Sequence, residues 1–134
     1  MTGRFVSAVA VLSLLAGSVA GAHHSFAAEY DETRPVTVKG AVTSMKWSNP
    51  HAWLYLDVKD PNGTVEHWSF ELGGVNGLYR QGWRREDLQT GTALTVDAYL
   101  SRTDPHVANS QNITLPDGRR LFAGSPAPRG ETRP

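Results

Sequence analysis

The sequence contains no cysteine among its 134 residues. That absence excludes a disulfide framework, a thiol nucleophile, a zinc–thiolate site and a lipid anchor attached through cysteine. An excess of one charge sign is also lacking, because 13 Lys and Arg residues offset 13 Asp and Glu residues. Without a basic field, the chain is not expected to bind nucleic acid or anionic lipid.

The familiar catalytic motifs are missing as well. The sequence has no Gly-rich phosphate loop, no nucleophile elbow and no His-Glu-x-x-His motif. Ser25 and Ser69 have no evident base partner, and Asp57 with His67 could orient a base but lacks a nucleophile to activate. We therefore predict that the protein is not an enzyme. Its length allows one domain and is too short for two ordinary ones.

The first residues have the pattern of an export signal. Arg4 supplies the positive charge, residues 5–16 are apolar or small, and residues 17–22 are small. Such a run is too short to cross a bilayer core of ~30 Å comfortably, although an uncleaved membrane anchor is the alternative. Cleavage after Ala20 or after Ala22 fits, and Ala22 better matches the A-x-A pattern. We expect residues 1–22 to be a signal peptide and the mature protein to be periplasmic or secreted.

The mature chain divides into three parts. Residues 23–34 form an N-terminal arm without clear periodicity, in which Phe26 and Tyr30 are spaced for one helical turn or for docking onto the domain. Residues 35–124 carry the β pattern, and residues 125–134, with three prolines and no apolar periodicity, form a disordered tail.

The first strand begins at Pro35 with Val36, Val38 and Val42 on one face. Gly40 interrupts it, and the later apolar residues, Met45 and Trp47, fall on odd positions. We predict one long strand that changes its inward face at Gly40, as a small coiled barrel requires.

The next two strands form a hairpin whose register follows from parity. Asp60-Pro61-Asn62-Gly63 fits a three-residue loop, which pairs Asp60 with Thr64. Leu56 then lies opposite Trp68, and Leu54 opposite Phe70. A two-residue loop would shift the pairing by one and set apolar residues against the polar face.

After the hairpin the periodicity changes to that of a short helix. Val75, Leu78 and Tyr79 have helical spacing, Gly82 is a stop signal, and Trp83 and Leu88 are expected to pack beneath the following loop. A fourth strand is predicted over residues 94–100, followed by a polar loop over residues 101–106 and a weaker fifth strand that ends at residues 113–115, with a short return at 121–122. This order predicts an all-β, OB-fold-like five-stranded Greek-key barrel with one short helix between strands 3 and 4. An open β-sandwich or half-barrel is the alternative.

Several blocks of sequence are similar to a known family. They are His23-His24-Ser25-Phe26, Tyr30-Asp31, Trp47-Ser48-Asn49-Pro50-His51-Ala52-Trp53, Leu72-Gly73-Gly74, Gly82-Trp83, Leu115-Pro116-Asp117-Gly118-Arg119 and Phe122-Ala123-Gly124. The sequence thereby resembles a family of small exported bacterial proteins of unknown function. The resemblance implies an exported single domain and no mechanism.

Two groups of residues are candidates for binding. The outer face of strands 2 and 3 and its flanking loops form the usual ligand platform of an OB-fold. Its ligand-binding candidates are Trp53, Tyr55, His67, Glu71 and Arg102. Parity sets Trp53 opposite Glu71 and Asp57 opposite His67. Alternatively, the arm or the helix covers the aromatic residues, and Asp57–His67 is an ordinary cross-strand pair.

The second group could bind copper. Cleavage after Ala22 gives His23 a free α-amine beside its imidazole and that of His24, a chelate that suits Cu(II). Folding back of the arm would bring His51 or His106 to the same metal, with Met45 as a soft ligand for Cu(I). Alternatively, the arm carries histidines without a physiological metal.

These observations predict an exported, non-enzymatic binding or accessory module for a small ligand or an envelope protein. Periplasmic copper binding or delivery is the alternative, with copper as the only candidate cofactor. We expect a monomer that binds neither nucleic acid nor, after signal cleavage, a membrane.

Overall fold

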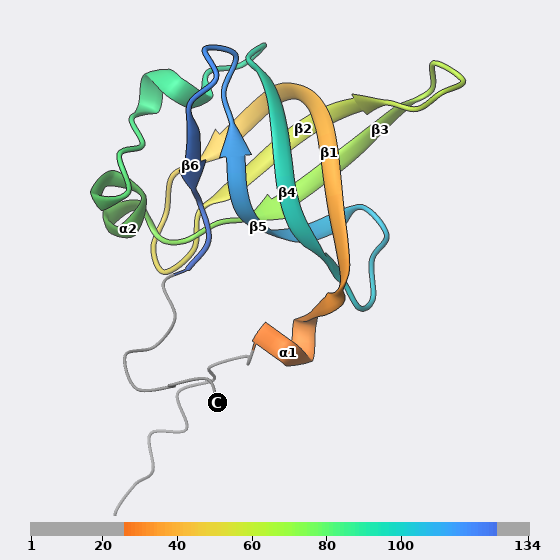
Figure 1. The fold of residues 1–134 in the computed structure, drawn as a ribbon, viewed down its shortest axis with the longest axis horizontal. Helices are drawn as coiled ribbons and strands as arrows, with labels where there is room; N and C mark the ends of the chain where they lie inside the picture. Colours follow the sequence, from red (N-terminus) through yellow and green to blue (C-terminus); the bar gives the residue numbers. More distant parts are fainter. Residues whose placement is uncertain (1–25, 126–134) are drawn as a thin grey trace, which may run out of the picture.

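The computed structural model describes residues 26–125, and the fold is mostly β (Figure 1). In chain order the elements are α1 (Phe26–Glu29), β1 (Tyr30–Lys46), β2 (Trp53–Lys59), β3 (Val65–Glu71), α2 (Val75–Arg80), the 3-10 helix η1 (Arg85–Leu88), β4 (Ala93–Ser101), β5 (Val107–Thr114) and β6 (Arg120–Phe122). The predicted signal peptide, the residues His23 and His24, and the tail from residue 126 lie outside the described residues.

The strands form one six-stranded sheet in the order β3-β2-β1-β4-β5-β6. Neighbours in this order are antiparallel, and β3 also pairs with β5 in parallel, through residues 69–71 and 107–109. That pairing closes β1 to β5 into a ring of strands. The all-β prediction is confirmed, and α2 lies between the third and fourth strands in the chain, as predicted.

The long strand β1 pairs with two different neighbours along its length. Its first half pairs with β4, and its second half pairs with β2 from Ala41 onward. The strand begins at Tyr30 rather than at Pro35, with an irregular ladder between these two residues. The predicted change of inward face at Gly40 is wrong in position, because Val42 is still buried and the bulge follows it.

Gly40 has a different role, which is close approach. A Cβ atom at Gly40 would lie 2.5 Å from the backbone oxygen of Asp57, so only glycine lets β1 touch β2 at the point where the two strands separate.

The predicted hairpin register is confirmed. Leu54 pairs with Phe70 and Leu56 with Trp68. The Asp60 N–H donates to the Thr64 oxygen at 2.9 Å, and Gly63 adopts φ +82°, which closes the three-residue loop. Residues of even number in both strands therefore face the interior of the ring.

The core fills the interior of the ring and extends beneath the segment after α2. Its largest fully buried side chains are Trp83, Phe70, Leu54, Leu56, Leu72, Leu78, Ile113, Val42 and Val96. Gly82, with φ +101°, follows the end of α2, and the indole N–H of Trp83 donates to the Phe122 oxygen at 2.8 Å. The predicted burial of Trp83 and Leu88 is confirmed. Among residues 26–125, no helix is both long and apolar enough to cross a membrane.

Candidate functional site

The outer side of the β2–β3 hairpin carries the predicted polar and aromatic row. Trp53 and Tyr55 are half-buried, and Trp53 pairs with Glu71 as predicted. Asp57 pairs with His67, whose Nδ1 lies 2.6 Å from the Asp57 Oδ1, and the His67 side chain is 82% exposed. The hairpin register therefore brings four of the predicted residues onto one face, and the Asp57–His67 pair is fixed by a cross-strand contact.

Glu71 differs from its neighbours because it is buried, at 8% exposure. The Tyr30 hydroxyl donates to its Oε2, and His51 Nδ1 lies 3.1 Å from its Oε1 without the alignment of a hydrogen bond. Burial and then the hydrogen bond to the Glu71 carboxylate raise the pKa of Tyr30 well above its ordinary value. Tyr30 thus stays a neutral donor to a buried carboxylate.

The loop between β1 and β2 positions His51 beside Glu71. The Ser48 hydroxyl donates to the His51 oxygen at 2.6 Å. Ala52 then makes backbone hydrogen bonds to the two residues that follow β3, donating to Gly73 at 3.2 Å and accepting from Leu72 at 2.9 Å. His51 is therefore held where the predicted platform ends, and its side chain remains 43% exposed.

Arg102 binds the start of the described chain. Its Nε donates to the Ala27 oxygen at 2.8 Å, and its Nη1 lies 3.4 Å from Asp31 Oδ2. The Phe26 ring contacts both Tyr30, at 5.5 Å between centroids, and Tyr99, at 5.9 Å. Arg102 was predicted as a ligand contact, and the structure gives its guanidinium two protein partners, which fasten α1 and the start of β1 to the β4–β5 loop.

His106 lies on the other side of β3 from His51. Its Nε2 is 3.4 Å from Glu66 Oε2, and its ring packs edge-on against Trp68 at 5.3 Å. Glu66 has an even number, like Trp68, and lies on the side of β3 that faces the interior of the ring, whereas Glu71 lies on the outer side. In residues 26–125 no three His, Cys, Asp or Glu side chains are grouped to hold a metal. Met45, the predicted soft ligand, packs against the core.

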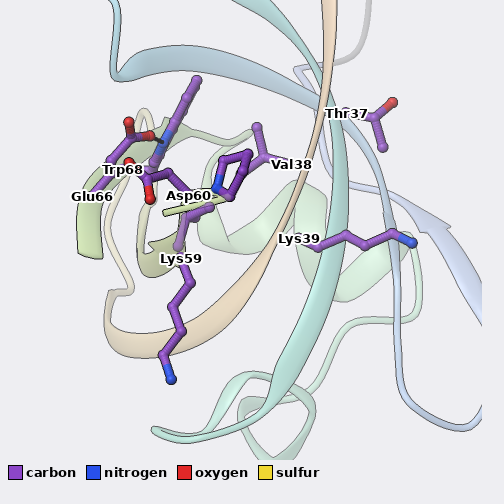
Figure 2. Close-up of a pocket in the computed structure, with 9 residues that line it drawn as sticks. Thr37, Val38, Lys39, Lys59, Asp60, Glu66 and Trp68 are labelled. Carbon is purple, nitrogen blue, oxygen red and sulfur yellow. Dashed lines mark hydrogen bonds between the residues drawn. The ribbon is translucent and has the colours of Figure 1, made fainter. Parts of the chain in front are cut away.

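A groove beside the hairpin was not predicted. It has a volume of about 450 Å³ and is lined by Thr37, Val38, Lys39, Val58, Lys59, Asp60, Pro61, Glu66 and Trp68. It opens where the β1–β2 ladder ends at Ala41 and Asp57. Figure 2 shows Trp68, Glu66 and Lys59 on the hairpin side and Lys39 on β1. Parity assigned Val38, Val58 and Trp68 to the inward face, and all three belong to the core or pack against it. Gly40 was the one signal that the strands part there.

The fold and these contacts define a small, mostly β protein with a strand ring and an accessible hairpin. The chain belongs to the DUF6152 family, a family of unknown function, whose model matches residues 10–109. Searches of curated proteins and of solved structures return no match to the chain.

Proposed function

We propose that this protein is an exported, non-enzymatic binding or accessory module that contacts an envelope protein through its β2–β3 hairpin. The observation that carries the proposal is the position of the hairpin. The β1–β2 ladder ends at Ala41 and Asp57, and the hairpin continues beyond it to the turn at residues 60–63 (Figure 1). Both sides of the hairpin therefore have accessible side chains.

A protein partner suits this hairpin better than a small molecule does. Tyrosine and tryptophan are enriched at protein interfaces, whose rims are polar, and Trp53 and Tyr55 lie beside the polar Asp57–His67 pair. The groove on the other side is open, whereas small-molecule sites bury most of their ligand. Export is supported by the signal-peptide pattern of residues 1–22, so the partner is expected in the cell envelope.

The test is site-specific photocrosslinking in cells that express the full chain. p-Benzoylphenylalanine replaces Tyr55 or His67 on the hairpin, and Gln89 serves as an exposed control position elsewhere. We expect one discrete protein adduct from both hairpin positions and none from Gln89. Equal adducts from all three positions, or none from any, would overturn the proposal.

The crosslinked partner is then purified and its affinity measured. We expect Tyr55→Ala to weaken binding about tenfold or more, because truncating an interface aromatic commonly costs above ~1 kcal/mol. The matched control is Tyr79→Ala on α2, where the exposed tyrosine lies off the hairpin. An equal loss in both variants would contradict the assigned surface. A small molecule that co-purifies with the protein and is lost in Tyr55→Ala would replace the protein partner with a small ligand.

Copper binding or delivery is a second candidate function, favoured by the environment of His51. Its Nδ1 faces Glu71, and the same carboxylate accepts from Tyr30, six positions after His24 in the sequence. Imidazoles with a terminal amine suit Cu(II). Titration of the mature protein with Cu(II) tests it. We expect His51→Ala and acetylation of the terminal amine to weaken the site and His106→Ala to leave it unchanged. A copper affinity that His51→Ala and acetylation both leave unchanged would remove this candidate.

A further inference from the structure

A second surface lies where the end of β1 meets α2, away from the hairpin. The Trp47 and Tyr79 rings stack at 6.0 Å between centroids, with 19° between their planes. The Arg85 guanidinium lies over Trp47 at 5.1 Å, and that of Arg84 lies over Tyr79 at 5.8 Å. We call these four residues the Arg–aromatic surface.

The buried Trp83 and backbone hydrogen bonds hold the two arginines of this surface in place. Trp83 is fully buried directly after Gly82, so the next two residues, Arg84 and Arg85, emerge together beside α2. Arg84 Nη1 donates to the Trp83 oxygen at 2.6 Å and to the Tyr79 oxygen at 3.2 Å. Because these bonds hold one guanidinium and stacking holds the other, little side-chain freedom remains to be lost when a ligand binds.

The surface carries an excess of positive charge in a chain whose formal net charge is zero. Arg84 and Arg85 are exposed there, and within the described part of the chain Arg85 has no carboxylate at ion-pair distance. The neighbouring Asp87 carboxylate is occupied by Arg119 at 2.7 Å. The N–H groups of Arg85 are therefore available to an anion from solution.

An open hollow of about 420 Å³ lies at this surface, lined by Tyr79, Arg84, Arg85 and Glu86. We propose that it binds an acidic sugar, a ring with a carboxylate of the uronic-acid class. Arginine binds carboxylates through two parallel N–H donors, and Tyr79, held between Trp47 and Arg84, is still 37% exposed, which leaves part of it accessible to the sugar. Glu86 accepts hydrogen bonds from sugar hydroxyls and repels a dianionic phosphate group more strongly than the single carboxylate of one sugar ring.

The test is isothermal titration calorimetry of the full chain with three probes: tetragalacturonate, neutral cellotetraose and inorganic phosphate. We expect tetragalacturonate to bind, with an affinity that falls as salt rises, and the other two not to bind. Arg85→Ala should weaken binding at least tenfold. Arg85→Lys should restore it only in part, because lysine keeps the charge and lacks the planar pair of donors.

Arg34→Ala is the matched control, since Arg34 is an exposed arginine at the start of β1, outside this surface. It should leave the affinity unchanged, and the hairpin variant Tyr55→Ala should do the same. Absence of tetragalacturonate binding, an equal loss in Arg34→Ala, or competition by phosphate at equal affinity would each overturn the proposal. Thermal unfolding of Arg85→Ala at the wild-type midpoint excludes misfolding as the cause of a loss.

Discussion

At the scale of single residues, the start of β1 is held in place by a hydrogen bond between two side chains that are far apart in the sequence. Tyr30 and Glu71 are 41 positions apart, yet the tyrosine hydroxyl donates to the buried carboxylate. A buried carboxylate without a donor is costly, so this bond stabilises both the start of β1 and the end of β3. Asn109 pairs with Glu71 across the β3–β5 closure, which places the bond beside the point where the ring closes.

Tyr30→Phe is expected to destabilise the protein by roughly 1–3 kcal/mol at pH 7, because it removes a buried donor. The folded-state pKa of Tyr30 is raised, so its contribution is complete below the unfolded pKa of ~10 and is lost as pH rises above it. Urea unfolding at pH 7 to 11 should show the two proteins converging above pH ~10. Tyr79→Phe, at an exposed position, is the control and should change stability by less than ~0.5 kcal/mol. A constant difference at all pH values would contradict the assignment.

Residue-level prediction from the sequence succeeded where parity alone decides. The opposition of Leu56 to Trp68 follows from a period of two and one loop length, both readable in sequence. The Tyr30–Glu71 bond and the binding of Ala27 by Arg102 have no such local signal. They depend on which distant segments the ring brings together.

At the scale of elements, one side chain of β4, Asp97, connects this strand to both β1 and β6. Asp97 Oδ1 accepts from the Thr37 hydroxyl of β1 at 2.8 Å, and its Oδ2 accepts from Arg120 of β6 at 2.9 Å. The hydrogen bonds from Arg120 and then Thr37 lower the pKa of Asp97. β6 is thus held by its ladder to β5 and by this contact to β4.

Asp97→Asn should reduce stability at pH 7 by up to about 1 kcal/mol, a value discounted because both partners are partly exposed to solvent. Since the folded pKa is lowered, the contribution is present above the unfolded pKa of ~3.9 and is lost as pH falls through the folded value. Chemical denaturation at pH 7 and pH 3 should therefore give a smaller difference in acid. Adding Arg120→Met to Asp97→Asn should lower the free energy of unfolding only slightly further. If the losses of the two single variants added up fully in the double variant, the two residues would not be coupled.

The elements were predicted well where apolar residues alternate and poorly where they do not. The hairpin and α2 follow from clear periodicity and turn residues. Residues 31–34 have no apolar alternation, so nothing in them revealed that β1 starts at Tyr30. The bulge after Val42 lies at a threonine, whereas sequence reasoning chose the nearby glycine, whose actual role is contact with Asp57.

For the whole molecule, the segment after α2 and the last strand are joined to the core by Trp83. Its side chain is fully buried, and its indole N–H reaches the Phe122 oxygen. Trp83→Phe should lower the free energy of unfolding by roughly 2–4 kcal/mol, from the cavity and the unpaired carbonyl. The denaturation midpoint should fall with an unchanged m value. Trp53→Phe, at a half-buried position, is the control with an expected loss below ~1 kcal/mol, and equal losses would show that Trp83 has no special role.

The candidate site was predicted only in part, because its two sides depend on the three-dimensional course of the strands. Parity placed Trp53, Tyr55 and His67 on the outer side of the hairpin. It could not show that β1 is not paired with β2 before Ala41, which opens the groove beside Trp68 (Figure 2). It also gave no reason to associate Trp47, which follows β1, with Arg85, which follows α2.

The parallel pairing of β3 with β5 has a consequence for the order in which this protein can be completed. Residues 69–71 find their second neighbour only when residues 107–109 have been synthesised. Any fragment that ends before Val107 leaves unpaired backbone along both β3 and β4, the kind of edge that recruits other chains into aggregates. The last fifth of the sequence therefore protects the edges of the earlier strands, and truncation in that region should produce insoluble protein rather than a smaller folded one.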